Sequence, residues 1–234
     1  MDEPRAYRQY RFRRPPGACE ILLVRHGESA PAVEGQTVPM VEGHGDPPLD
    51  PVGERQAERV AERIAESGES IAAIYVTNLQ RTQQTAAPLA ARLGLEPRVE
   101  RDLREVFLGE WEGGTLFRRN VTEQHPIAVR MFAEQRWDVI PGAEPTAQLA
   151  ERVRGVITRI AAAHADETVV VVAHGGVIGQ ILADASGSRS FAFTGSDNAA
   201  ISHIVVTPDR WIIRRYNDTA HLGAAFTEGP EPLT

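Results

Sequence analysis

Short apolar runs alternate with longer amphipathic stretches along this chain. Residues 21–24 form a continuous apolar run, and residues 168–173 are rich in β-branched valine; both patterns are typical of buried central strands. A third strand is predicted over residues 71–76. Two late strands are predicted over residues 201–206 and 211–215, joined by a turn.

Amphipathic segments between these runs predict helices. Asp50 is expected to cap the first helix and Asn78 the second, which should run to about residue 93 and end near Gly94. Two later helices are predicted over residues 146–164 and 176–185. The apolar positions of the first helix have helical spacing and should be buried: Val52, Ala57, Val60, Ala61 and Ile64.

This alternation predicts an α/β fold, a three-layer sandwich with a mainly parallel central sheet flanked by helices. Residues 113–141 are less regular, and we interpret them as a helical excursion that could cover a site. Residues 1–17 form a basic, arginine-rich extension, for which the simplest interpretation is a solvated tail. Residues 18–234 are expected to form a single domain.

Composition narrows the class of protein. No stretch approaches the ~20 apolar residues that a membrane-spanning helix needs, and the charged first residues do not resemble a secretory signal. The net charge of −7 argues against a nucleic-acid partner. Cys19 is the single cysteine, so no disulfide can form within the chain, and a cytoplasmic location is expected.

Chemically versatile side chains follow the predicted strands. Arg25 and His26 come directly after the first strand, His174 follows the valine-rich strand, and Arg81 lies early in the helix after the second strand. Ligands of open α/β sheets bind at the carboxyl ends of the strands, so these four residues are expected to converge. Two arginines and two histidines suit a phosphate dianion, since a guanidinium donates in a planar fork.

The sequence lacks the motifs of several other kinds of phosphate-binding site. It contains no P-loop, no glycine-rich dinucleotide fingerprint and no acidic cluster suited to Mg²⁺. We therefore expect no metal and no cofactor. A phosphate site of this kind favours covalent catalysis, and a neutral imidazole can act as the nucleophile.

The segment Leu23-Val24-Arg25-His26-Gly27-Glu28-Ser29 resembles the signature of the histidine phosphatase superfamily, which includes the cofactor-dependent phosphoglycerate mutases. Four further segments resemble the family in the same order: residues 46–57, 77–86, 103–113 and 172–176. Five ordered matches are far more specific than an isolated Arg-His-Gly.

The resemblance implies a phosphoglycerate mutase-like fold and assigns roles residue by residue. His26 would become phosphorylated, while Arg25, Arg81 and His174 would hold the phosphoryl oxygens. Glu105 would protonate the leaving alkoxide and later deprotonate the attacking water. The implied activity is metal-independent hydrolysis of a small phosphomonoester.

The chain departs from the family pattern at one position of the site. Many relatives carry an asparagine six residues after the nucleophile, where this chain has Ala32. A phosphate contact would then be lost or supplied elsewhere, and Ser29 is the candidate. Substrate selectivity is expected to reside in the loop of residues 29–46 and in the excursion.

Two other functions stay open at this point. A mutase would share the phosphohistidine but keep water out, and a non-catalytic module could keep the phosphate pocket alone. We favour the phosphatase, and a homodimer is a further hypothesis.

The other histidines are expected to be structural or on the surface. One arginine of the excursion is a candidate substrate contact, and the four possibilities are Arg118, Arg119, Arg130 and Arg136.

Overall fold

The computed structural model describes residues 6–7 and 9–223, and its centre is a six-stranded sheet in the order β5-β4-β6-β1-β7-β8. The strands are β1 (Cys19–Arg25), β4 (Ile71–Val76), β5 (Arg98–Val99), β6 (Thr168–Ala173), β7 (Ile201–Val206) and β8 (Trp211–Asp218). Strands β1, β4, β5 and β6 are parallel to one another, whereas β7 and β8 are antiparallel additions at one edge.

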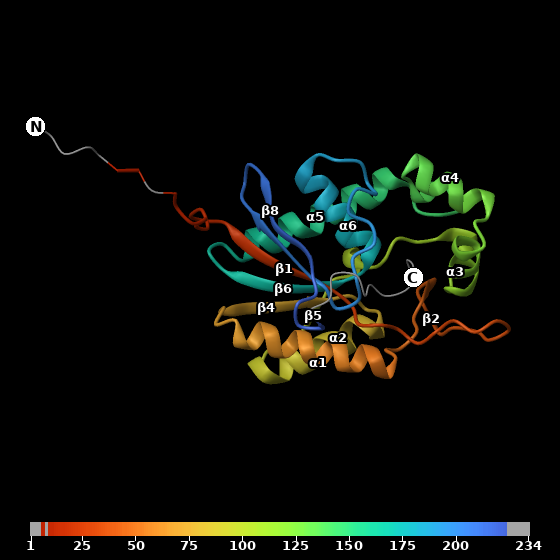
Figure 1. Cartoon of the computed structure of the whole chain (residues 1–234), viewed down its shortest axis with the longest axis horizontal. Coiled ribbons are helices and arrows are strands. Elements are labelled where there is room, and N and C mark those ends of the chain that lie inside the picture. Colours follow the sequence, from red (N-terminus) through yellow and green to blue (C-terminus); the bar gives the residue numbers. More distant parts are fainter. Residues whose placement is uncertain (1–5, 8, 224–234) are drawn as a thin grey trace, which may run out of the picture.

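Helices cover both faces of the sheet (Figure 1). Helices α1 (Pro51–Glu66) and α2 (Gln80–Leu93) lie on one face, and α5 (Thr146–Ala163) and α6 (Gly175–Ser186) lie on the other. Each face has its own apolar core, because alternate residues of a strand point to opposite sides. The predicted three-layer α/β sandwich is confirmed.

The register of β1 against β6 brings the two predicted histidines together. Arg25 is paired with Ala173, the last residue of each strand. The next residues, His26 and His174, therefore leave the sheet side by side at its carboxyl edge. This placement follows from the pairing of strands that are far apart in sequence.

The helix starts illustrate one success and one error of the sequence prediction. Asp50 caps α1 as predicted, and its carboxylate accepts a hydrogen bond from Val52 N at 2.8 Å. The expectation that Asn78 caps α2 is wrong. Gln80 N instead donates to the carboxylate of Asp46 at 2.8 Å, a residue of a distant loop.

One apolar position of α1 also departs from the prediction. Val52 is 38% exposed, whereas Ala57, Val60, Ala61 and Ile64 are buried. Val52 lies in the first turn of α1, before the part of the helix that packs on the sheet.

The less regular segments gather beyond the carboxyl ends of the strands (Figure 1). They include a small hairpin of β2 (Met40–Val41) and β3 (His44–Gly45), and the short helices η1 (Arg101–Leu103), η2 (Gly109–Trp111), α3 (Thr115–Thr122), α4 (Pro126–Glu134) and η3 (Trp137–Val139). Residues 113–141 are thus helical, as predicted. Phe117, Met131 and Trp137 anchor them to the core that α5 and α6 share.

Phe12 and Arg14, near the end of the basic N-terminal segment, contact the rest of the domain. Arg14 donates to the carbonyl of Asp166, and the Arg214 guanidinium lies 3.9 Å from the centre of the Phe12 ring. Tyr10 is 94% exposed. Arg5 and Arg8 lie outside the described residues, and the boundary at residue 17 stays a prediction.

No helix in the described part of the chain is long and apolar enough to cross a membrane.

Candidate active site

Two histidine rings lie side by side, tilted toward each other, at the carboxyl edge of the sheet. The ring centres of His26 and His174 are 5.2 Å apart, with an angle of 60° between the planes. His26 is 6% exposed and His174 is fully buried. We call Arg25, His26, Arg81, Glu105 and His174 the sheet-edge cluster.

The hydrogen bond of His26 fixes its tautomer. Nδ1 lies 2.7 Å from the carbonyl oxygen of Gly27, and a carbonyl can only accept, so Nδ1 carries the proton. Burial lowers the pKa of His26 well below its usual value, and the positive charges of Arg81 and Arg25 lower it further. The imidazole is therefore neutral near pH 7, with a free lone pair on Nε2.

Backbone carbonyls orient both arginines of the cluster. Arg25 Nη1 donates to Ser196 O, and Arg81 Nη1 donates to Gly45 O at 2.9 Å. Burial lowers the pKa of each guanidinium, while the charge of Glu105 opposes that shift. Each group is thus a buried cation held in a fixed direction beside His26.

His174 is oriented by Thr77, the residue that directly follows β4. Its Nε2 lies 3.2 Å from the hydroxyl of Thr77, and its Nδ1 has no hydrogen-bond partner among the described residues. Burial lowers the pKa of His174 well below its usual value, with further contributions from Arg81 and His26. The ring of His174 is therefore neutral near pH 7 in the free site.

The carboxylate of Glu105 is docked at the N-terminus of α6. It accepts hydrogen bonds from Val106 N at 3.0 Å and from Gly176 N at 3.2 Å. A Cβ atom on Gly176 would lie 2.6 Å from Glu105 Oε1, so a larger residue there would displace the carboxylate. The same helix N-terminus favours a bound anion.

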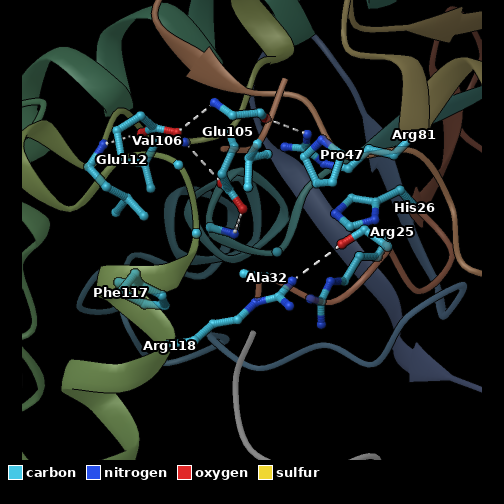
Figure 2. A pocket seen from close by; sticks show the side chains of 18 of the residues that line it. Arg25, His26, Ala32, Pro47, Arg81, Glu105, Val106, Glu112, Phe117 and Arg118 are labelled. Carbon is cyan, nitrogen blue, oxygen red and sulfur yellow. Dashed lines mark hydrogen bonds between the residues drawn. The ribbon is translucent and has the colours of Figure 1, made fainter. Parts of the chain in front are cut away.

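The sheet-edge cluster borders a cavity of about 150 Å³. Arg25, His26, Arg81 and Glu105 line it, and His174 lies behind His26. Figure 2 shows Arg25 and His26 on one side, Glu105 on another, and Arg118 reaching in from α3. The excursion and the β2–β3 hairpin region add apolar walls: Val38, Phe117, Phe132 and Trp137.

Ser29 and Arg118 lie with Ala32 in the wall of the cavity. Ala32 lines the cavity, and Ser29 does too, but the hydroxyl of Ser29 accepts a hydrogen bond from Arg118 Nη2 at 3.4 Å. Burial lowers the pKa of Arg118, and the charge of Glu28 opposes the shift. A third guanidinium therefore faces the cavity on this side. Arg119, Arg130 and Arg136 instead form exposed ion pairs.

Several supporting residues were not predicted from the sequence. Thr85 accepts a hydrogen bond from Gly27 N at 2.9 Å, and Asn198 donates to His26 O at 3.0 Å. Glu112 accepts from Gly45 N and from Leu108 N, both at 2.9 Å, and so ties the hairpin to the loop after Glu105. Thr85 and Glu112 lie in segments that resemble the family, but the resemblance assigned them no role, and no pattern in the sequence indicates Asn198.

The other histidines contribute elsewhere in the fold. His44 bonds to Glu42 and packs on Phe107, and His125 caps α4. His164 bonds to Tyr75 and Glu167. His203 pairs with Glu20, and His221 bonds to Arg63. None of the five lines the cavity. Across residues 6–7 and 9–223, no group of three or more His, Cys, Asp or Glu side chains is arranged to hold a metal ion.

Known proteins share both this sequence pattern and this fold. The model of the histidine phosphatase superfamily (branch 1) matches residues 21–219. The metal-independent phosphoserine phosphatase of Arabidopsis thaliana is 32% identical over 211 residues, 88% of this chain and 84% of that protein. Phosphoglycerate mutase-like protein 4 of the same plant is 35% identical over 157 residues, 66% of this chain and 67% of that protein.

A solved structure agrees with these similarities. The mycobacterial glucosyl-3-phosphoglycerate phosphatase superposes with a TM-score of 0.71 at 26% identity, covering 86% of this chain and all of that one. The chain therefore belongs to branch 1 of the histidine phosphatase superfamily, as an enzyme that hydrolyses phosphomonoesters.

Proposed function

We propose that this enzyme cleaves its substrate in two steps through a phosphohistidine on His26. The observation that carries the proposal is the protonated Nδ1 of His26, 2.7 Å from Gly27 O, in a ring whose pKa is lowered by burial. Nε2 then has an available lone pair at neutral pH. A neutral nucleophile can attack a phosphate dianion that the neighbouring arginines hold.

In the first step, Nε2 of His26 attacks phosphorus and the bond to the leaving oxygen breaks. The carboxyl of Glu105 gives its proton to the departing alkoxide. In the second step, water attacks phosphorus, Glu105 takes the proton from that water, and the P–N bond breaks. Inorganic phosphate leaves, and both His26 and Glu105 return to their starting states.

Arg25, Arg81 and His174 would stabilise the charge that develops on the phosphoryl oxygens. These groups are preorganised by contacts with Ser196, Gly45 and Thr77, so little reorganisation is needed during the reaction. The N-terminus of α6 adds backbone donors. No step requires a metal ion, in keeping with the metal-independent relative.

The substrate is a small phosphorylated compound, and we propose that it carries a second anionic group. Arg118 is the support from this chain, since it lines the cavity in addition to the two arginines of the sheet-edge cluster. Phosphoserine and glucosyl-3-phosphoglycerate, named for two similar proteins, both combine a phosphate with a carboxylate. A panel that compares carboxylated with uncharged alkyl phosphates tests this choice.

The decisive experiment is trapping of the intermediate. The enzyme is mixed with substrate, quenched and analysed by mass spectrometry under conditions that preserve phosphohistidine. We expect the mass of one phosphoryl group on the peptide that contains His26. Turnover without such an intermediate would refute the covalent route, and phosphoryl transfer to a second substrate hydroxyl instead of water would favour a mutase. Binding without turnover would favour the non-catalytic module.

The remaining expectations are also proposals. We propose that the protein works in the cytoplasm, on the basis of the single cysteine, and binds no nucleic acid, on the basis of the net charge of −7. The homodimer stays a hypothesis. Light scattering measures the oligomeric state, and a shift assay with duplex DNA measures nucleic-acid binding.

A further inference from the structure

The loop that carries Glu105 has little regular structure of its own. It lies between η1 and η2, and two of its carbonyl groups, together with one carbonyl of η1, accept hydrogen bonds from one side chain. Arg152 of α5 donates to Asp102 O at 2.7 Å, to Arg104 O at 2.9 Å and to Glu105 O at 3.3 Å. Backbone carbonyls outside helices and strands need hydrogen-bond donors from elsewhere. Arg152 supplies these donors to the loop, as a neighbouring strand would in a sheet.

Arg152 is itself held by a carboxylate. Its Nε and Nη2 donate to the two oxygens of Glu144 at 2.6 and 2.8 Å, and the side chains are only 20% and 10% exposed. Glu144 also joins the far end of the loop, because its backbone N donates to Phe107 O at 2.9 Å. A planar guanidinium can make all these bonds at once, whereas an ammonium group cannot.

The carboxylate of Glu105 projects from the opposite side of the same loop. It reaches the N-terminus of α6, where a Cβ atom on Gly176 would displace it. The position of the carboxylate in the cavity therefore depends on Val106 N and Gly176 N, which bind its oxygens, and on Arg152, which holds the backbone of its loop. Arg152 does not line the cavity.

We propose that Arg152, anchored by Glu144, is a positioning residue that keeps the carboxyl of Glu105 within reach of the leaving oxygen. This inference rests on the proposed function, since it requires Glu105 to be the proton donor. A displacement of about 1 Å at a reacting group can cost on the order of 10²-fold in rate. Loss of Arg152 should thus weaken proton donation while the phosphate contacts of Arg25 and Arg81 persist.

The test compares substrates with poor and good leaving groups. Arg152→Met should slow hydrolysis of an alkyl phosphate by about 10²-fold and that of 4-nitrophenyl phosphate only a few-fold, because a phenolate departs without a proton. Arg152→Lys should give the same signature, since it keeps the charge but loses the fork. Arg154→Met is the matched control: Arg154 is on the same helix, 61% exposed and paired with Asp184, and should leave both rates unchanged.

A double variant tests whether Arg152 acts through Glu105. In a Glu105→Gln background, Arg152→Met should cause little further loss on the alkyl substrate, because the group that it positions can no longer donate. Vanadate binding and a thermal melt check that the site and the fold persist. If Arg152→Met does not fold, Glu144→Gln removes the anchor more gently and should change the same leaving-group dependence.

The outcomes separate this inference from the proposed function. If Glu105→Gln slows both substrates equally, Glu105 is not the proton donor, and both the proposed donor role and the positioning role are refuted. If Glu105→Gln is selective for the alkyl substrate but the Arg152 and Glu144 variants are not, only the positioning role is overturned.

Discussion

The sheet-edge cluster and the excursion form different walls of one cavity, and they are held in different ways. Arg25, His26, Arg81 and His174 each bond to a backbone carbonyl or a buried hydroxyl. Arg118 of the excursion has a longer contact, 3.4 Å to Ser29. It also follows two glycines, Gly113 and Gly114, with positive φ angles.

We interpret this difference as a division of tasks: the sheet-edge cluster carries out the reaction, and the excursion selects the substrate. A group that reacts must be fixed before substrate arrives, and bonds to backbone carbonyls and a buried hydroxyl achieve that. A group that only recognises substrate can sit on short helices at the rim, where variation does not disturb the sheet. We therefore expect substitutions in the sheet-edge cluster to affect turnover on all substrates, and substitutions in the excursion to affect some substrates more than others.

The largest effect is expected for His26→Ala. Turnover should fall by about 10⁴-fold or more, since the two-step route has no nucleophile. Vanadate or phosphate affinity should fall only modestly because Arg25, Arg81 and His174 remain, and stability should change little because the buried strand is intact. Turnover, calorimetry and a thermal melt measure these three quantities. Retention of more than a few per cent of wild-type turnover would place the nucleophile elsewhere.

Glu105→Gln should have the next largest effect, and it should depend on the substrate's leaving group. An alkoxide needs a proton as it departs, so alkyl phosphates should be hydrolysed about 10²–10⁴-fold more slowly. Aryl phosphates should lose much less. Steady-state rates on both classes check the prediction, and equal losses would identify Glu105 as a binding or structural residue.

A smaller and more selective loss is expected for Arg118→Ala. An ionic hydrogen bond contributes about 1.5–3 kcal/mol, so kcat/KM for carboxylated substrates should fall on the order of 10- to 100-fold. Uncharged alkyl phosphates should be affected less. Arg119→Ala is the control, because Arg119 is the next residue of α3 and pairs with exposed Glu34. Similar losses from both variants, or on both substrate classes, would remove the distinction between the two walls.

The smallest effect concerns stability against pH. The folded pKa of His26 and of His174 lies well below the unfolded value of about 6.5, so the unfolded chain takes up protons first on acidification. Stability should be unaffected by these groups above about pH 6.5. It should fall below that pH by about 1.4 kcal/mol per pH unit for each histidine.

Urea unfolding at several values between about pH 6.5 and 5 measures this slope. His26→Ala should make it shallower. His125→Asn should leave it unchanged, because His125 is an exposed cap of α4 and asparagine can cap in its place. An unchanged slope in His26→Ala would mean that the buried ring is not the source of the pH dependence.

The sequence by itself predicted five of the six strands of the sheet, all except β5, and the residues of the sheet-edge cluster. Apolar runs such as β1 and β6 identify buried strands, and the polar residues directly after them must emerge at the carboxyl edge. Arg25, His26 and His174 were therefore predictable from position alone. Glu105 was identified by resemblance, since its loop follows no regular pattern.

Only the tertiary structure decided which distant groups meet. The cap of α2 comes from Asp46 and not from Asn78. Arg118 is the one excursion arginine among the described residues that lines the cavity. Arg152 supports the Glu105 loop from α5. Local periodicity reports which face of an element is buried, and it carries no information on which segments pack together. Those contacts depend on strand register and side-chain reach, which exist only once the chain has folded.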